Sequence, residues 1–134
     1  MPTPKTMKQP PPLDAQQAFI QFSNTYLLQQ SARRYTELCS NDKGRRKLLE
    51  SLCHKYHSCV RPECIQQRNY EKIGNPPCYA FHSSIPFGTF YPTVHEAHDS
   101  LSIVDGWLII LRDASVGIHR PEGRWDDEFL IDGR

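Results

Sequence analysis

Soft metal-ligand side chains cluster near the middle of the chain. Within twelve residues the sequence places Cys53, His54, His57, Cys59 and Cys64. Thiolate sulfur and imidazole nitrogen are ligands that Zn²⁺ prefers, and Cys53 and His57 are four residues apart, which on a helix brings them to one face. Cys64 and Cys78 would complete a tetrahedral site.

The alternative for this cluster is ordinary core packing. The chain has no C-x-x-C pair, and Cys53 and Cys59 lie on the apolar face of the helix predicted there, where a thiol is usually a small buried hydrophobic group. His54 and His57 fall toward the opposite, solvent face. Structural zinc, at Cys53, His57, Cys59 and Cys64, is therefore the weaker interpretation, and no cofactor is predicted.

Two further polar groupings invite a metal interpretation. His95 and His98 are three residues apart, whereas the two histidines of the zinc-protease motif H-E-x-x-H are four apart. A capped surface helix explains this pair better. Asp126, Asp127 and Glu128 offer carboxylates for a divalent cation, but a run of acids between strands is more often a solvated turn.

Nucleophilic catalysis would require a thiolate or alkoxide beside a general base. Cys78, with His82, His95 or His98 as the base and Asp99 as a third group, is the one grouping that fits. The sequence contains no G-x-S-x-G elbow, phosphate-binding P-loop or G-x-G-x-x-G turn. An enzyme is therefore the least favoured class of function.

The charges are segregated along the chain. Residues 33–61 hold eight basic and three acidic side chains, whereas residues 96–134 hold four and nine. Two interpretations remain open: the halves complement each other, or the basic half binds nucleic acid or another anion. The anion-binding candidates lie on the second predicted helix: Arg45, Arg46, Lys47, His54 and Lys55. Three consecutive cations cannot all point one way, and no helix-turn-helix, zinc-finger or RNP-type pattern accompanies them.

The aromatic side chains exceed what a thin sheet can bury. The residues concerned are Phe87, Phe90, Tyr91, Trp107 and Trp125. Exposed aromatic groups are typical of interaction surfaces, although the loop 87–91 could instead cover a sheet edge. The leading hypothesis is a non-enzymatic binding module that holds a protein partner, or a second copy of itself, through this loop and the sheet surface around Trp107 and Trp125.

These residues must be positioned by a helical N-terminal half. Asp14 caps a first helix predicted to run to about Cys39, and Ser40, Asn41 and Asp42 end it and cap a second helix running to about Val60. Residues 62–73 form a weak third helix, closed by Gly74-Asn75-Pro76-Pro77.

The sequence pattern of the C-terminal half predicts a sheet. Residues 78–83 alternate large and small side chains as a half-buried strand would, and a short helix at 94–101 follows the capping box of Thr93 and Glu96. Asp105-Gly106 predicts a hairpin between strands 101–104 and 107–111, or one long strand containing a glycine. Strands at 116–119, 124–125 and 129–131 complete the pattern.

Length and composition complete the expected picture. At 134 residues and 15.5 kDa, residues 13–134 form one domain, a helical half over 13–73 and a mainly β half over 78–134, behind a disordered Pro-rich tail over 1–12. With no apolar run of membrane-spanning length, no secretory signal and five cysteines, a cytoplasmic protein is expected. The fold class is α+β: two main N-terminal helices on an antiparallel meander of about four or five strands.

Overall fold

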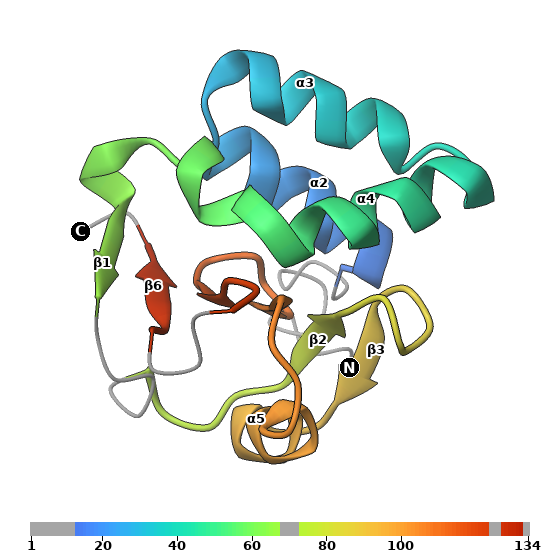
Figure 1. Cartoon of the computed structure of the whole chain (residues 1–134). Coiled ribbons are helices and arrows are strands. Elements are labelled where there is room, and N and C mark those ends of the chain that lie inside the picture. Colours follow the sequence, from blue (N-terminus) through green and yellow to red (C-terminus); the bar gives the residue numbers. More distant parts are fainter. Residues whose placement is uncertain (1–12, 68–72, 124–126, 133–134) are drawn as a thin grey trace, which may run out of the picture.

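The computed structural model describes residues 13–67, 73–123 and 127–132, except the side chains of Cys53 and His54. The α+β class is confirmed: in the described part of the chain, three helices precede a six-stranded antiparallel sheet, and a fourth helix lies within the β half (Figure 1). The Pro-rich tail and the strand predicted at 124–125, which includes Trp125, lie outside the described residues.

The helical half consists of α2 (Ala15–Tyr26), α3 (Gln29–Leu38) and α4 (Asp42–Lys55). Two 3₁₀ turns follow, η1 (Tyr56–Cys59) and η2 (Pro62–Cys64). The Asp14 carboxylate accepts the backbone N–H of Gln17 and forms the capping box that starts α2, and the Asn41 side chain accepts the N–H of Gly44 at the start of α4. Side-chain oxygens at these positions satisfy donors that have no partner within the helix.

The prediction of one helix from Asp14 to Cys39 is wrong, because the chain is extended at Leu27 and Leu28. Leu27 forms an isolated antiparallel bridge with Val60, and the Leu28 N–H donates to the Cys59 carbonyl at 2.8 Å. Leu27 is 3% exposed. Pairing with Val60, 33 residues farther along the chain, outweighs the local preference for helix, which is a weak one.

The sheet has the order β1-β6-β5-β4-β2-β3, and every neighbouring pair is antiparallel. Its strands are β1 (Ile65–Gln67), β2 (Cys78–Phe81), β3 (Thr89–Tyr91), β4 (Trp107–Leu111), β5 (Gly117–Arg120) and β6 (Phe129–Ile131). The weak helix predicted over 62–73 is wrong, because η2 and β1 occupy its first part. β4, β5 and β6 form a meander as expected, while β1 and β3 lie at the two edges.

Helices cover both faces of this sheet. Along β4, Leu108 and Ile110 join the core beneath α2, α3 and α4, whereas Trp107, Ile109 and Leu111 join a second core beneath α5 (Val94–Leu101). Figure 1 shows α5 on the side of the sheet opposite to the other helices. β2 is buried on both faces too, so the half-buried strand predicted there is wrong.

The Asp105-Gly106 turn joins a helix to a strand instead of two strands. α5 ends at Leu101, residues 102–106 turn, and the Gly106 N–H donates to the Arg120 carbonyl at 2.8 Å. Gly106 has φ of 72°, which glycine tolerates without strain. The hairpin prediction is wrong, whereas the short helix predicted at 94–101 is confirmed as α5, and Val94, Ala97 and Leu101 are buried on its inner face.

Gly44 is required by the close approach of α4 to α3. A methyl group added at Gly44 would lie 2.2 Å from the carbonyl oxygen of Leu38, and backbone cannot move aside as a flexible side chain can. Helix propensity alone predicts that Gly44→Ala stabilises the protein by about 1 kcal/mol. We expect the reverse, a loss of roughly 1–3 kcal/mol from overpacking, measured by urea denaturation. Lys43→Ala, at the exposed neighbouring position, is the control and should change stability by less than about 0.5 kcal/mol. Greater stability of Gly44→Ala would contradict the close contact.

Candidate functional site

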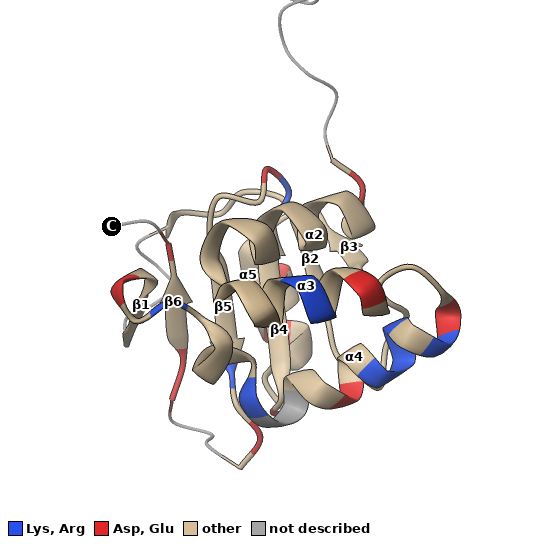
Figure 2. Ribbon diagram, turned by 90° about the horizontal axis from the view of Figure 1, so that it is seen from above, with Lys and Arg blue, Asp and Glu red and all other residues tan. Residues whose placement is uncertain are grey.

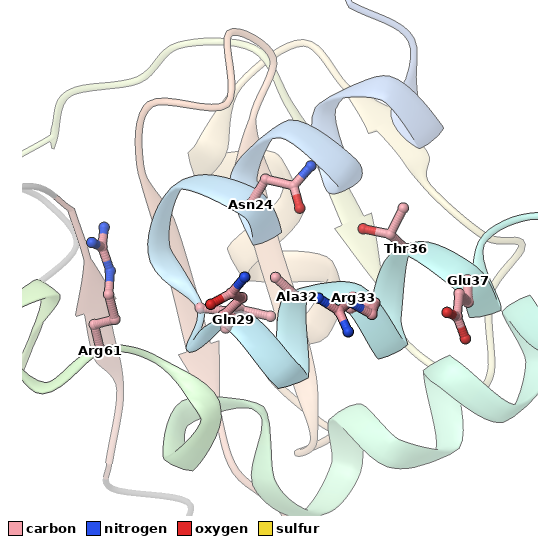
Figure 3. A pocket seen from close by; sticks show the side chains of 8 residues that line it. Asn24, Gln29, Ala32, Arg33, Thr36, Glu37 and Arg61 are labelled. Atoms are coloured by element: carbon pink, nitrogen blue, oxygen red, sulfur yellow. The ribbon is translucent and has the colours of Figure 1, made fainter.

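A groove of about 530 Å³ lies at the surface between the end of α2 and the outer face of α3. Its base includes the buried side chains of Leu27 and Ala32. Its polar lining consists of Asn24, Gln29, Arg33, Thr36, Glu37 and Arg61. In Figure 3, Arg61 stands at the end where α3 begins, Thr36 and Glu37 lie farther along α3, and Asn24 reaches in from α2.

The break between α2 and α3 positions these groups. The bridge between Leu27 and Val60 brings the segment after η1 alongside the junction, and the Arg61 N–H donates to the Tyr26 carbonyl at 2.9 Å. The Arg61 guanidinium also donates to the Thr25 carbonyl. Arg61 is thereby held against the end of α2 by both its backbone and its side chain.

Several polar groups of the groove have no protein partner. The Thr36 hydroxyl oxygen and Arg61 Nε are buried without a hydrogen bond to any described residue. Arg33 is exposed and forms no ion pair within the described part of the chain. Because the Thr36 hydroxyl oxygen and Arg61 Nε are buried, a ligand in the groove does not reach them, and the exposed donors that it meets are the Arg33 guanidinium and the amides of Asn24 and Gln29. Guanidinium and amide donors together suit a carboxylate or another oxyanion.

Most of the described aromatic side chains that were predicted to form a binding surface are buried or partly buried. Trp107 is fully buried beneath α5 and is therefore not available to a partner. Phe87 packs on Phe19 and Phe81 with ring centroids 6.0 and 5.1 Å apart. Phe90 is 47% exposed, against Tyr79 and beneath the guanidinium of Arg112. The partly buried Tyr91 packs on the core beneath α5, and Trp125 lies outside the described residues.

The predicted basic helix presents mixed charge. Arg45 pairs with Asp42 and donates to the Cys39 carbonyl. The exposed cations on the helix are Lys43, Arg46, Lys47 and Lys55, and Glu50 is exposed with them. Figure 2 shows basic and acidic segments interspersed along α3 and α4. The side chain of His54 is outside the described residues.

The predicted metal ligands do not assemble among the described side chains. No group of three or more His, Cys, Asp or Glu there has the geometry to hold a metal ion. Cys64 packs in the core beneath α2, α3 and α4, whereas Cys78 packs in the core on the other side of the sheet. His57 stacks on Phe129 at 4.9 Å and on His119 at 5.4 Å. Cys59 is partly buried, and the side chain of Cys53 is not described.

The predicted nucleophile is separated from its bases. Cys78 and His82 lie at opposite ends of β2, and the imidazole nitrogens of His82 bond Ser84 and the Asp105 carbonyl. Burial raises the pKa of Cys78 to about 12, with a smaller contribution from Glu96. Its sulfur faces the Thr93 carbonyl at 3.8 Å. His95 and Asp99 are exposed on α5.

His98 and Glu128 belong instead to an ion pair with Arg120. His98 Nε2 lies 2.8 Å from the Glu128 carboxylate, to which Arg120 also donates. Burial by itself would raise the pKa of Glu128, but the hydrogen bonds from His98 and Arg120 outweigh it and the pKa is lowered. This pairing occupies one of the three acids predicted as a cation site. Asp126 lies outside the described residues.

Comparison with known proteins adds no relative: the chain matches no protein-family model and shows no significant similarity to a curated protein or a solved structure.

The groove was missed by reasoning from sequence. Arg33 and Arg61 were visible as cations, but they are 28 residues apart and only the break at Leu27 and Leu28 brings them to one groove. No helix among the described residues is long and apolar enough to cross a bilayer.

The described cysteines should differ sharply in reactivity. Burial raises the pKa of both Cys39 and Cys78 to about 12, and the thiolate is the form that reacts. At pH 7.5 we expect iodoacetamide to modify the partly buried Cys59 first, and Cys39, Cys64 and Cys78 only in urea, as measured by peptide mass spectrometry. Modification of native Cys78 at the rate of a free thiol would contradict this prediction and support the hypothesis that Cys78 is a nucleophile.

His119 should make the fold sensitive to acid. Burial, with a smaller effect of His57, lowers the pKa of His119 to about 3, against the hydrogen bond to the Leu52 carbonyl, which raises it. Between pH 6.5 and 3 the unfolded chain therefore binds a proton that the folded chain does not. Stability should fall with decreasing pH by up to about 1.4 kcal/mol per unit in that window. NMR titration should show a neutral His119 ring at pH 5, whereas exposed His95 serves as the control; titration of His119 near pH 6.5 would contradict its burial.

Proposed function

We propose that this protein is a non-enzymatic binding module that holds an acidic segment of a partner protein in the groove between α2 and α3. The observation that carries the proposal is the lining of the groove, which brings the exposed side chain of Arg33 and the guanidinium of Arg61 into one hollow. An arginine fork matches the geometry of a carboxylate and is the side chain best suited to hold one at an interface.

The groove also fits the size of a peptide side chain and its backbone. It is open to solvent and its lining is mixed, with amides at Asn24 and Gln29 that can pair with an extended chain. Trp107, which the sequence predicts on the aromatic binding surface, is buried in the core. Among the described aromatic candidates Phe90 is the most exposed. The groove thus replaces the sheet surface as the main contact, and Phe90 stays a secondary candidate.

Nucleic-acid binding is the alternative, through Arg46, Lys47 and Lys55 of α4. Its support is weaker, because Asp42 and Glu50 are exposed on the same helix and Glu37 lies in the groove. A polyanion would meet these carboxylates, and non-specific binding depends on the number of phosphates neutralised. A peptide with one or two carboxylates need not approach Asp42 or Glu50, but Glu37 lines the groove itself, so the peptide has to place its carboxylate toward the Arg61 end and away from Glu37.

The cytoplasmic location stays a prediction. It is supported by the free thiols of Cys39, Cys59, Cys64 and Cys78, because a reducing compartment keeps cysteines in that form.

Charge reversal in the groove tests the proposal. We would titrate ¹⁵N-labelled protein with a pool of acetylated octapeptides of Asp, Glu, Ser and Gly, and with the matching pool in which Asn and Gln replace the acids. The acidic pool should shift the amide signals of Gln29, Arg33 and Arg61. Arg33→Glu and Arg61→Glu should each weaken binding by about tenfold, equivalent to about 1.4 kcal/mol.

Lys47→Glu is the matched control, since it changes the net charge equally at an exposed site outside the groove. It should leave the affinity within twofold. Equal shifts with the amide pool, or equal loss in all three variants, would contradict a carboxylate site. Tighter binding of single-stranded DNA, with shifts centred on Lys43, Arg46 and Lys47, would replace the proposal with the nucleic-acid alternative.

A further inference from the structure

A second hollow, also of about 530 Å³, lies along the outer face of α2. It is lined by Leu13, Gln17, Ile20, Gln21, Asn24 and Thr25. The five of these residues that belong to α2 are spaced to lie on one side of the helix, opposite Phe19, Phe22 and Tyr26, which face the core, and Leu13 precedes the helix. The hollow is therefore a property of the exposed face of α2.

The two hollows adjoin at one residue. Asn24 lines both of them, and it stands at the upper edge of the groove in Figure 3. At 1.5 Å per residue, Gln17 lies roughly 10 Å along the helix from Asn24, and Leu13 precedes the start of the helix. Together the hollows form a surface that follows α2 and continues onto α3.

The two ends of this surface differ in chemistry. The α2 end has two partly exposed aliphatic side chains, Leu13 and Ile20, and no cation. The α3 end has Arg33 and Arg61. Gln17 is occupied in the capping box with Asp14, so it competes little for a ligand.

We infer that one partner segment spans both hollows, placing an aliphatic side chain against Leu13 and Ile20 and a carboxylate against Arg33 and Arg61. This inference rests on the proposed function and adds the second half of the recognised sequence. A ligand held by charge alone would be bound weakly at a solvent-exposed site. Apolar contact supplies affinity, and the arginines fix the direction in which the segment lies.

Selection from a random 12-residue peptide library displayed on phage tests this inference. Peptides enriched on the wild-type protein should carry an Asp or Glu and a Leu, Ile, Val or Phe at one constant spacing. Synthetic copies should bind Ile20→Ser at least fivefold more weakly, as measured by fluorescence anisotropy. Ile103→Ser removes an equally aliphatic side chain, 81% exposed and beyond α5, and should bind as the wild type does.

Because Ile20 also packs on the core, Gln21→Arg provides a second variant that enters the same hollow from an exposed position. It should weaken binding similarly while the melting temperature is unchanged. Enriched peptides that carry acids without an aliphatic consensus, and that bind Ile20→Ser and Gln21→Arg normally, would overturn the inference and leave the carboxylate site intact. Enrichment without acidic residues, insensitive to Arg33→Glu, would overturn the proposed function as well.

Discussion

The burial of both faces of β4 is the constraint on which the rest of the structure depends. Leu108 and Ile110 on one face, and Ile109 on the other, are all fully buried. A sheet with two apolar faces must be covered twice, since exposing either would forgo roughly 25 cal/mol for each Å² of apolar surface. α5 packs on one face, and the helices of the N-terminal half pack on the other.

That requirement explains why the N-terminal half is three helices. A single helix from Asp14 to Cys39 would run about 38 Å, well past the strands, each three to five residues long, that it has to cover. Ending α2 at Tyr26 lets α3 fold back across α2 and α4. Leu27 enters the core at the bend, where its bridge with Val60 replaces helical hydrogen bonds with a tertiary one. The groove exists because two helices that meet at such a bend diverge at their outer surfaces.

Local patterns were enough to predict the class of the fold and some of its elements, but not all of them. The α+β class, the caps at Asp14 and Asn41 and the inward face of α5 follow from period, capping residues and turn chemistry, which act within four residues. The errors all concern long-range pairing. No residue near Leu27 indicates that it pairs with Val60, and none near Gln66 indicates pairing with β6. Asp105-Gly106 suits a turn between a helix and a strand as well as it suits a hairpin. The burial of Trp107 likewise depends on α5, which no strand pattern reveals.

The same distinction explains why the candidate site could not be predicted. Residue types that do chemistry, such as Cys78, His82 and His98, were easy to find, but the fold gives each of them a structural partner. The groove is built instead from common residues, Asn24, Gln29 and Thr36, together with Arg33 and Arg61, whose significance is purely geometric. Its walls are fixed by bonds that owe nothing to a ligand: the Leu27 bridge and the contact of Arg61 with the Tyr26 carbonyl. Binding there would require little reordering of the backbone, and a surface that needs little reordering retains more of its contact energy as affinity.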